Sequence, residues 1–89
     1  MLLEIITPQK VYFREDVELV RVPGSKGSFA MLHNHAPIIS TLEKGIIKIT
    51  NLGKDRYFEL LEEAIVEQHQ NHITILAAKI KETFPIYIR

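Results

Sequence analysis

The stretch that decides the fold is PGSKGSFAMLHNHAPIISTLEKG, residues 23–45. Gly24 and Gly27 bracket a short polar turn, and an apolar stretch at residues 28–32 follows it. A polar loop, residues 33–37, comes next and ends on a proline, which stiffens its exit. Glycine adopts backbone angles that other residues avoid, so this stretch can hold a sharply shaped surface. Shaped loops on a rigid β scaffold are common places for binding.

Short apolar stretches recur on both sides of this segment, separated by turn residues. Many are rich in β-branched residues, and several alternate apolar with polar positions, as half-buried antiparallel strands do. Ile47 and Ile49, for example, share one face of a strand, and Lys48 lies on the other. We therefore predict an all-β fold, a small antiparallel β-sandwich or flattened barrel of about eight to ten short strands. The stretches that support it are residues 2–7, 17–22, 28–32, 45–50 and 72–77.

Residues 55–68 have a pattern that fits two structures. Glu, Leu and Ala are good helix formers, and several apolar residues follow helical spacing, which favours a helix. The alternative is a strand that ends near Leu60, a turn at residues 62–63, and a second strand over residues 64–68. The local pattern leaves both open. The residues with helical spacing are Phe58, Leu61, Ala64, Ile65 and Gln68.

The chain has 89 residues, enough for one small domain. A domain of this size buries only about 60–65% of the surface of its unfolded chain, so we expect a partner to add stability. Apolar residues alternate from Phe84 to Ile88, and Pro85 interrupts any helix. We therefore expect a β-sandwich domain over residues 1–78 and an extended C-terminal tail over residues 79–89.

Charge and composition narrow the function classes. The chain carries 11 basic and 11 acidic residues with no long run of one sign, which argues against nucleic acid as the main partner. It has no cysteine, which excludes disulfides, a thiolate nucleophile and cysteine metal ligands. The first residues lack the pattern of a signal peptide, and the apolar runs are far too short to span a membrane. We expect a soluble domain on the cytosolic side.

The four histidines form two pairs, His33 with His35 and His69 with His72. Their spacing fits no known zinc site, and a structural zinc site needs a closed set of four ligands. We therefore expect no bound metal, and we expect His35 to hydrogen-bond within its own turn or to contact a partner. A small metalloenzyme built from the four histidines is an alternative that metal analysis of the purified protein would test.

The sequence carries no recognisable catalytic motif. None of the serines lies in a Gly-x-Ser-x-Gly elbow with an evident acidic partner. Residues 24–27 lack the spacing and the following helix of a phosphate-binding loop. We expect Glu62, Glu63 and Glu67 to be solvated on an exposed turn. The sequence therefore predicts no catalysis and no cofactor. The serines considered are Ser25, Ser28 and Ser40.

Strand alternation leaves some apolar residues on the outer side of the predicted strands. An apolar outer patch on a small domain usually marks a partner surface. This pattern indicates a subunit of a larger assembly. The residues are Leu2, Ile6, Ile46 and Leu61.

Residues 23–45 resemble the epsilon subunit of bacterial ATP synthases, which corresponds to the mitochondrial delta subunit. The family pattern is a glycine-containing turn, a short strand, a His-Ala-Pro loop and a Lys-Pro-Gly-like turn. The resemblance extends over most of the chain, through a first strand at residues 2–8 and a closing strand at residues 71–77. The matching positions of the central stretch are Gly24, Gly27, Phe29, Leu32, His35, Ala36, Pro37, Leu42, Lys44 and Gly45.

The sequence departs from the family pattern at several places. Ala30 stands where the family usually has glycine, residues 33–34 read His-Asn in place of Pro-Gly, and residues 63–65 read Glu-Ala-Ile in place of Gly-Gly-Phe. The family places strands across residues 55–68, so we expect strands there. The family usually adds two C-terminal helices that in some members inhibit ATP hydrolysis or bind ATP. This chain ends at Arg89, so we expect neither property from it.

The resemblance implies a non-catalytic central-stalk subunit of a proton- or sodium-translocating ATP synthase. It would link the gamma subunit to the polar loops of the membrane c-ring and couple ion flow to ATP synthesis, without nucleotide or cofactor. The complex would hold it peripherally at the cytoplasmic face of the bacterial inner membrane. By position in the family pattern, we expect partner contacts at Gly24, Ser25, Lys26, Gly27, Ser28, Met31, His33, Asn34, His35, Ala36 and Pro37.

Lys26 stands where the family often has acidic or polar residues. A lysine there would change the charge complementarity with the ring, so the matching ring loop should be less basic than usual. The alternative function is a generic β-sandwich binding module unrelated to the synthase.

Overall fold

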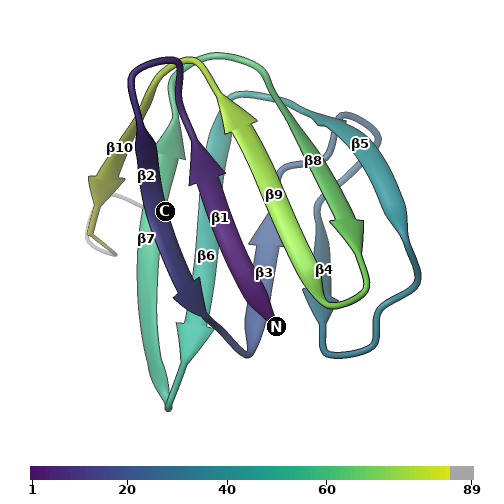
Figure 1. Ribbon diagram of the computed structural model, residues 1–89. Helices are drawn as coiled ribbons and strands as arrows, with labels where there is room; N and C mark the ends of the chain where they lie inside the picture. The colour runs from purple at the N-terminus through teal and green to yellow at the C-terminus, as the bar shows by residue number, and fades with distance from the viewer. Residues whose placement is uncertain (85–89) are drawn as a thin grey trace.

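The computed structural model describes residues 1–84 and consists of ten β-strands joined by turns and loops (Figure 1). Within these residues the chain forms no helix. The strands are β1 (Leu2–Ile6), β2 (Val11–Asp16), β3 (Leu19–Val22), β4 (Phe29–Leu32), β5 (Ile38–Leu42), β6 (Gly45–Asn51), β7 (Lys54–Leu60), β8 (Ala64–His69), β9 (His72–Ala77) and β10 (Ile80–Thr83).

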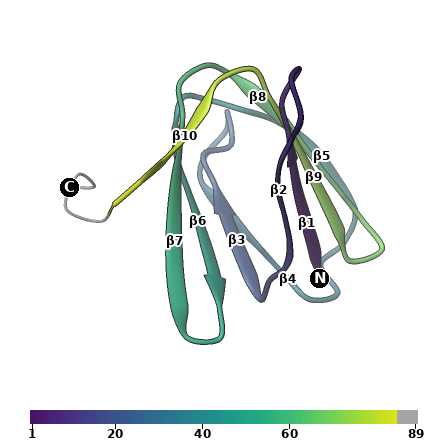
Figure 2. The same ribbon diagram turned by 60° about the vertical axis from the view of Figure 1, so that its left-hand side comes forward.

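The strands form two five-stranded sheets that face each other across the core (Figures 1 and 2). Sheet A has the order β2-β1-β9-β8-β5, and sheet B has the order β10-β7-β6-β3-β4. Since residues 1–84 form two separate sheets and no closed barrel, the predicted all-β sandwich is confirmed. Neighbouring strands are antiparallel except β1 and β9, which run parallel with Leu3 opposite Ile73. The parallel pair joins sequence-distant parts of the chain in the middle of sheet A.

β7 and β8 occupy the segment whose local pattern left helix and strand open. In β8, Ala64, Val66 and Gln68 point into the core, and the residues between them point outward. β8 pairs with β5 on one side and with β9 on the other, so its backbone groups are bonded along both edges. This pairing and the burial of one face outweigh the helix propensity of the segment, because propensities are worth only tenths of a kcal/mol per residue. The strand prediction from the family pattern is confirmed.

The inward faces of the two sheets share one core of buried apolar side chains. Phe58 of β7 is 1% exposed and packs edge-on against Phe13 of β2 at 5.5 Å and Tyr12 at 5.8 Å between ring centroids. Such aromatic contacts join sheet B to sheet A and add to the free energy gained from burial. The core consists of Leu3, Ile5, Phe13, Val17, Val20, Val22, Met31, Leu42, Ile47, Ile49, Phe58, Leu60, Ala64, Val66, Ile73, Ile75 and Ala77.

Arg56 of β7 closes the side of the sandwich between β2 and β10. Its guanidinium donates hydrogen bonds to Glu82 at 3.0 and 3.1 Å and to Glu15 at 3.1 Å. The same group lies over the rings of Phe13 and Phe58, 5.2 and 5.4 Å from their centroids. The hydrogen bond to Glu82 raises the pKa of Arg56, so the cation stays charged. These contacts tie the edge of sheet A to the edge of sheet B.

β10 lies within the stretch that the sequence assigned to an extended tail. It pairs with β7, with Ile80 opposite Leu60 and Thr83 opposite Tyr57, and so becomes the edge strand of sheet B. Residues 85–89, the rest of that tail, lie outside the described residues. The domain boundary after residue 78 stays a prediction.

Candidate partner-binding surface

The turn at residues 24–28 joins β3 to β4 and folds against the end of β5. The Ser25 amide donates to the carbonyl oxygen of Thr41 at 3.0 Å, and the Thr41 hydroxyl donates to Ser25 Oγ at 2.8 Å. The Gly27 amide donates to the carbonyl oxygen of Gly24 at 2.9 Å, which closes the turn on itself. The glycine-rich turn that the sequence predicts is therefore held in one shape.

The loop at residues 33–37 joins β4 of sheet B to β5 of sheet A. The His35 amide donates to the carbonyl oxygen of Leu32 at 3.0 Å. Nδ1–H of the His35 ring donates to the carbonyl oxygen of Ala36 at 2.7 Å, because a carbonyl only accepts. His35 thus hydrogen-bonds within its own loop, one of the two roles expected for it. The exposed residues of the loop are His33, Asn34, Ala36 and Pro37.

The structure separates these two segments. Phe29, the first residue of β4, adjoins turn 24–28, and Leu32, the last residue of β4, adjoins loop 33–37. The two therefore lie at opposite ends of β4 and present separate surfaces (Figure 1). Met31, which the family pattern placed among the contact residues, has its side chain in the core at 0% exposure. It supports the strand from inside and offers no side-chain surface to a partner.

The outer face of sheet A carries an apolar row that crosses four strands. Val11 of β2 lies opposite Ile6 of β1. Leu76 of β9 lies opposite both Ile6 and Ile65 of β8. Leu76 is 50% exposed, Val11 53% and Ile65 45%, so these side chains are half open to solvent. We call these four residues the apolar row.

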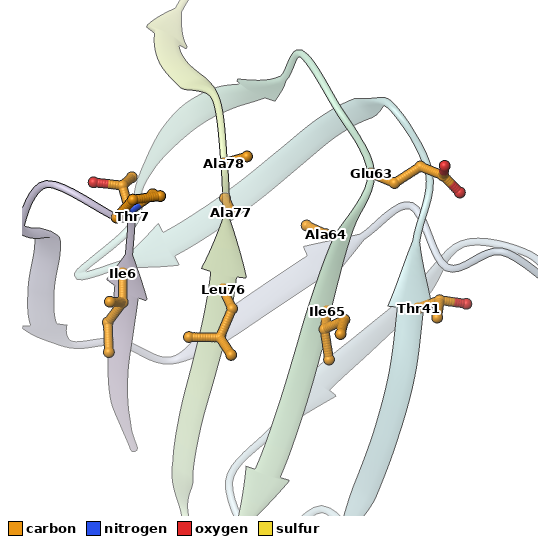
Figure 3. Close-up of a pocket in the computed structure, with 10 residues that line it drawn as sticks. Ile6, Thr7, Thr41, Glu63, Ala64, Ile65, Leu76, Ala77 and Ala78 are labelled. Atoms are coloured by element: carbon orange, nitrogen blue, oxygen red, sulfur yellow. The ribbon is translucent and has the colours of Figure 1, made fainter.

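Beside the apolar row, the sheet face is hollowed into a shallow groove of about 610 Å³ (Figure 3). Figure 3 shows Ile6, Leu76 and Ile65 side by side on neighbouring strands, with Thr41 on the next one. Thr41 also bonds Ser25, so the groove lies close to turn 24–28. The lining residues are Ile6, Thr7, Pro8, Thr41, Glu63, Ala64, Ile65, Leu76, Ala77 and Ala78.

Beyond the apolar row this sheet face is mostly polar, and Leu2 of β1 and Ile39 of β5 are its apolar exceptions. His72 Nε2 donates to Glu4 Oε1 at 2.6 Å on adjacent strands. Glu4 lies in one row with Thr74 of β9 and Glu67 of β8, next to the apolar row, and His72 lies in the row beyond it. The apolar row is therefore confined to the end of the face where turn 24–28 lies.

Sequence reasoning found only one member of the apolar row, Ile6. Among the other residues it expected on an outer side, Leu2 lies on the same face, Ile46 is half-buried in sheet B, and Leu61 lies in the turn after β7. It missed Val11, Ile65 and Leu76. Alternation with buried neighbours signals that Ile65 and Leu76 point outward, but only the pairing of β8 with β9 brings them together.

The histidine pairs form no ligand set. His69 and His72 lie opposite each other across the β8–β9 turn, whereas His33 and His35 lie in loop 33–37. Across residues 1–84, no three His, Asp or Glu side chains are placed so that they can hold a metal ion. Over the same residues, the structure contains no helix of the length and hydropathy that a membrane crossing requires.

Comparison with known proteins identifies the family. The sequence model described as "ATP synthase, Delta/Epsilon chain, beta-sandwich domain" matches residues 1–83. The chain belongs to this family. The recognition made from residues 23–45 is thereby confirmed, and the family comprises accessory subunits that are not catalytic.

Curated relatives carry the name ATP synthase epsilon chain. The protein of Pelotomaculum thermopropionicum is 40% identical over 75 residues, which are 84% of this chain and 55% of the relative. The protein of Magnetococcus marinus is 36% identical over 74 residues, 83% of this chain and 53% of the relative. The chain therefore spans little more than half the length of these members of the family.

Solved structures with this fold include parts of mitochondrial ATP synthases. A chain in the Euglena gracilis structure of OSCP, F1 and c-ring superposes with a TM-score of 0.86 and 14% identity, over 92% of this chain and 52% of that one. A chain in the Tetrahymena thermophila central stalk and c-ring structure gives a TM-score of 0.77 and 19% identity, over 91% and 65%. At these identities the likeness shows the shared β-sandwich fold alone.

Proposed function

We propose that this chain is a central-stalk subunit of a proton- or sodium-translocating ATP synthase that links the gamma subunit to the membrane c-ring. It catalyses nothing and passes torque between ring and gamma, so that ion flow drives ATP synthesis. It sits peripherally at the cytoplasmic face of the bacterial inner membrane. Membership of the delta/epsilon family and the fold shared with chains of central-stalk assemblies support this role.

The observation that carries the proposal is the apolar row on the outer face of sheet A. Its residues lie in register on adjacent, hydrogen-bonded strands, so the surface is rigid and needs no rearrangement to bind. An apolar patch of this kind on a small domain fits the surface of another protein subunit. We assign the apolar row and its groove to the gamma subunit.

We assign turn 24–28 to the polar loops of the c-ring. The exposed side chains of the turn, Ser25, Lys26 and Ser28, are polar or charged and suit a polar partner. Thr41 bonds Ser25 and lies opposite Ile65 of the apolar row, so the two surfaces adjoin. This arrangement lets one rigid domain hold both partners. Gamma then extends along sheet A toward loop 33–37.

Binding to the gamma subunit encoded in the same genome tests the proposal. We expect the chain to co-purify with gamma and Ile65→Lys to weaken binding at least about tenfold, because it puts a charge into an apolar contact. Leu52→Lys is the matched control, since it also replaces an exposed apolar side chain by lysine but lies in the β6–β7 turn of sheet B, away from the outer face of sheet A. Its affinity should change by less than about threefold.

The two parts of the proposal fail in different ways. A wild-type chain that does not bind gamma would show that the central-stalk role is wrong. Binding that survives Ile65→Lys, with the variant folded by circular dichroism, would show that gamma uses another face.

A further inference from the structure

Loop 33–37 crosses from sheet B to sheet A at the end of the sandwich where the β8–β9 turn lies (Figure 1). Most of its residues are exposed, and the flanking apolar side chains are open to solvent, Leu32 at 52% and Ile39 at 74%. An exposed crossing loop loses much of its backbone freedom only when specific contacts hold it. Such contacts come from three amide side chains: Asn34 of the loop, Gln68 of β8 and Asn71 of the β8–β9 turn.

Asn71, at the end of the β8–β9 turn, bonds Asn34 of the loop twice. The backbone N–H of Asn34 donates to Asn71 Oδ1 at 2.6 Å, and Asn71 Nδ2 donates to Asn34 Oδ1 at 3.1 Å. The Asn71 carbonyl oxygen also accepts from the Leu2 amide at 2.9 Å. One residue thus ties the loop to the turn and to the start of β1.

Both asparagines have left-handed backbones, with φ of 64° at Asn34 and 60° at Asn71. Glycine is the residue that such a conformation favours, and asparagine is the common alternative. A glycine at 71 would keep the turn but lose both bonds to residue 34, whereas a glycine at 34 would lose the bond to Asn34 Oδ1 and keep the bond from its own backbone N–H. The asparagines therefore add side-chain hydrogen bonds that the left-handed backbone does not require.

Gln68 holds the same loop from the core side. It is the buried polar side chain of residues 1–84, at 1% exposure, and shares the inward face of β8 with Ala64 and Val66. Its amide nitrogen is assigned to the side that faces two acceptors, where it donates to the carbonyl oxygens of Ala36 at 2.8 Å and His35 at 3.1 Å. Burying an amide destabilises the fold unless it is hydrogen-bonded, so these bonds account for a glutamine in the core.

We propose that Gln68 and Asn71 are positioning residues that hold loop 33–37 in its partner-binding shape. The loop, with Leu32 and Ile39 beside it, is then a preorganised contact surface, and binding orders it at little further entropic cost. This inference rests on the proposed function for its partner, the gamma subunit. The holding of the loop itself depends only on the contacts within this chain.

Amide hydrogen exchange of the free chain tests the first step. Asn71→Gly should speed exchange of the amides in loop 33–37 by about five- to tenfold, because two hydrogen bonds are lost while the left-handed turn is kept. In Asn71→Asp the loop amides should exchange at a rate between those of Asn71→Gly and the wild type. The aspartate keeps an acceptor for the backbone N–H of Asn34 but loses the Nδ2 donor. The matched control is Gln70→Gly, at φ 51° in the same turn, whose side chain makes no hydrogen bond within residues 1–84.

Gln68→Met separates holding the loop from holding the fold. Methionine fills a similar volume and has no polar group to satisfy, so the Tm should not fall, while exchange in the loop rises as in Asn71→Gly. Gamma affinity should drop by about three- to tenfold in both variants and stay unchanged in Gln70→Gly.

Loop exchange equal to the wild type in both Asn71→Gly and Gln68→Met would overturn the positioning role. Faster exchange with unchanged gamma affinity would show that the loop is held but is not the contact surface. Faster exchange in a chain that never binds gamma would leave the positioning of the loop standing and reject the proposed function instead.

Discussion

At the scale of single residues, Gly24 is the position where a side chain fits least. A Cβ built there would lie 2.6 Å from the carbonyl oxygen of Gly27 and 2.7 Å from the ring of Phe29. The Gly27 amide donates to the Gly24 carbonyl oxygen in the hydrogen bond that closes turn 24–28, so the Gly27 backbone has little room to move. Gly24 is needed for close approach of the backbone, and the turn keeps its shape because this glycine is there.

Gly24→Ala should therefore destabilise the chain by about 2 kcal/mol or more, roughly 10 °C in Tm for a domain of this size. Thermal unfolding followed by circular dichroism measures it. Gly53→Ala is the comparison, because nothing lies within 4 Å of its added Cβ and only its φ of 73° opposes the change. We expect about 1 kcal/mol there. Equal losses in the two variants would contradict the steric argument.

At the scale of elements, β8 has one face in the core and the other on the apolar row. Val66 is 0% exposed and belongs to the core, whereas its neighbour Ile65 is 45% exposed and belongs to the apolar row. Because successive side chains of a strand point to opposite faces, adjacent positions separate stability from binding. The strand gives rigidity on one side and a partner surface on the other.

Truncation at these two neighbours should have unequal effects on stability. Val66→Ala should lower the free energy of unfolding by about 2 kcal/mol, because buried methyl groups are lost and a cavity remains. Ile65→Ala should change it by no more than about 0.5 kcal/mol. Urea unfolding of both variants provides the measurement. A large loss of stability in Ile65→Ala would show that the apolar row is structural and not a free surface.

The helical spacing within residues 55–68 shows why element type was open from the sequence. Residues at 58, 61, 65 and 68 line one face of a helix, yet in the structure Phe58 and Gln68 both point inward from different strands. Alternation was also present, from Ala64 to Gln68. Whether the helical spacing or the strand alternation determines the structure depends on the strands available for pairing. The strands that pair with β8, β5 and β9, come from outside the segment.

At the scale of the whole molecule, β10 tests where the domain ends. It adds one edge strand to sheet B, and its Glu82 bonds Arg56, which also bonds Glu15 of sheet A. We expect the chain of residues 1–78 to fold as a sandwich with β7 as the new edge. It should be less stable by about 2–3 kcal/mol, because the burial of Ile80 and the Arg56–Glu82 bonds are lost.

A chain of residues 1–84 is the control for that truncation, since it keeps β10. Circular dichroism shows whether the 1–78 chain folds, and thermal unfolding of the two chains measures how much stability it loses. An unfolded 1–78 chain would show that β10 belongs to the domain and that the boundary after residue 78 is wrong.

The sequence by itself determined the fold class, the glycine turn 24–28, the loop 33–37 and the family. The fold class, the turn and the loop follow from local information, because alternation, glycine and proline act on the backbone within a few residues. The family follows from the resemblance of residues 23–45 and the flanking strands to its pattern. Tertiary structure alone decided that the turn and the loop lie at opposite ends of β4, that Met31 is buried, and that Asn34 meets Asn71. It also assembled the apolar row from four strands, of which β1 and β9 are far apart in the chain. A period of two shows which residues share a face, but only the pairing of strands determines which residues become neighbours.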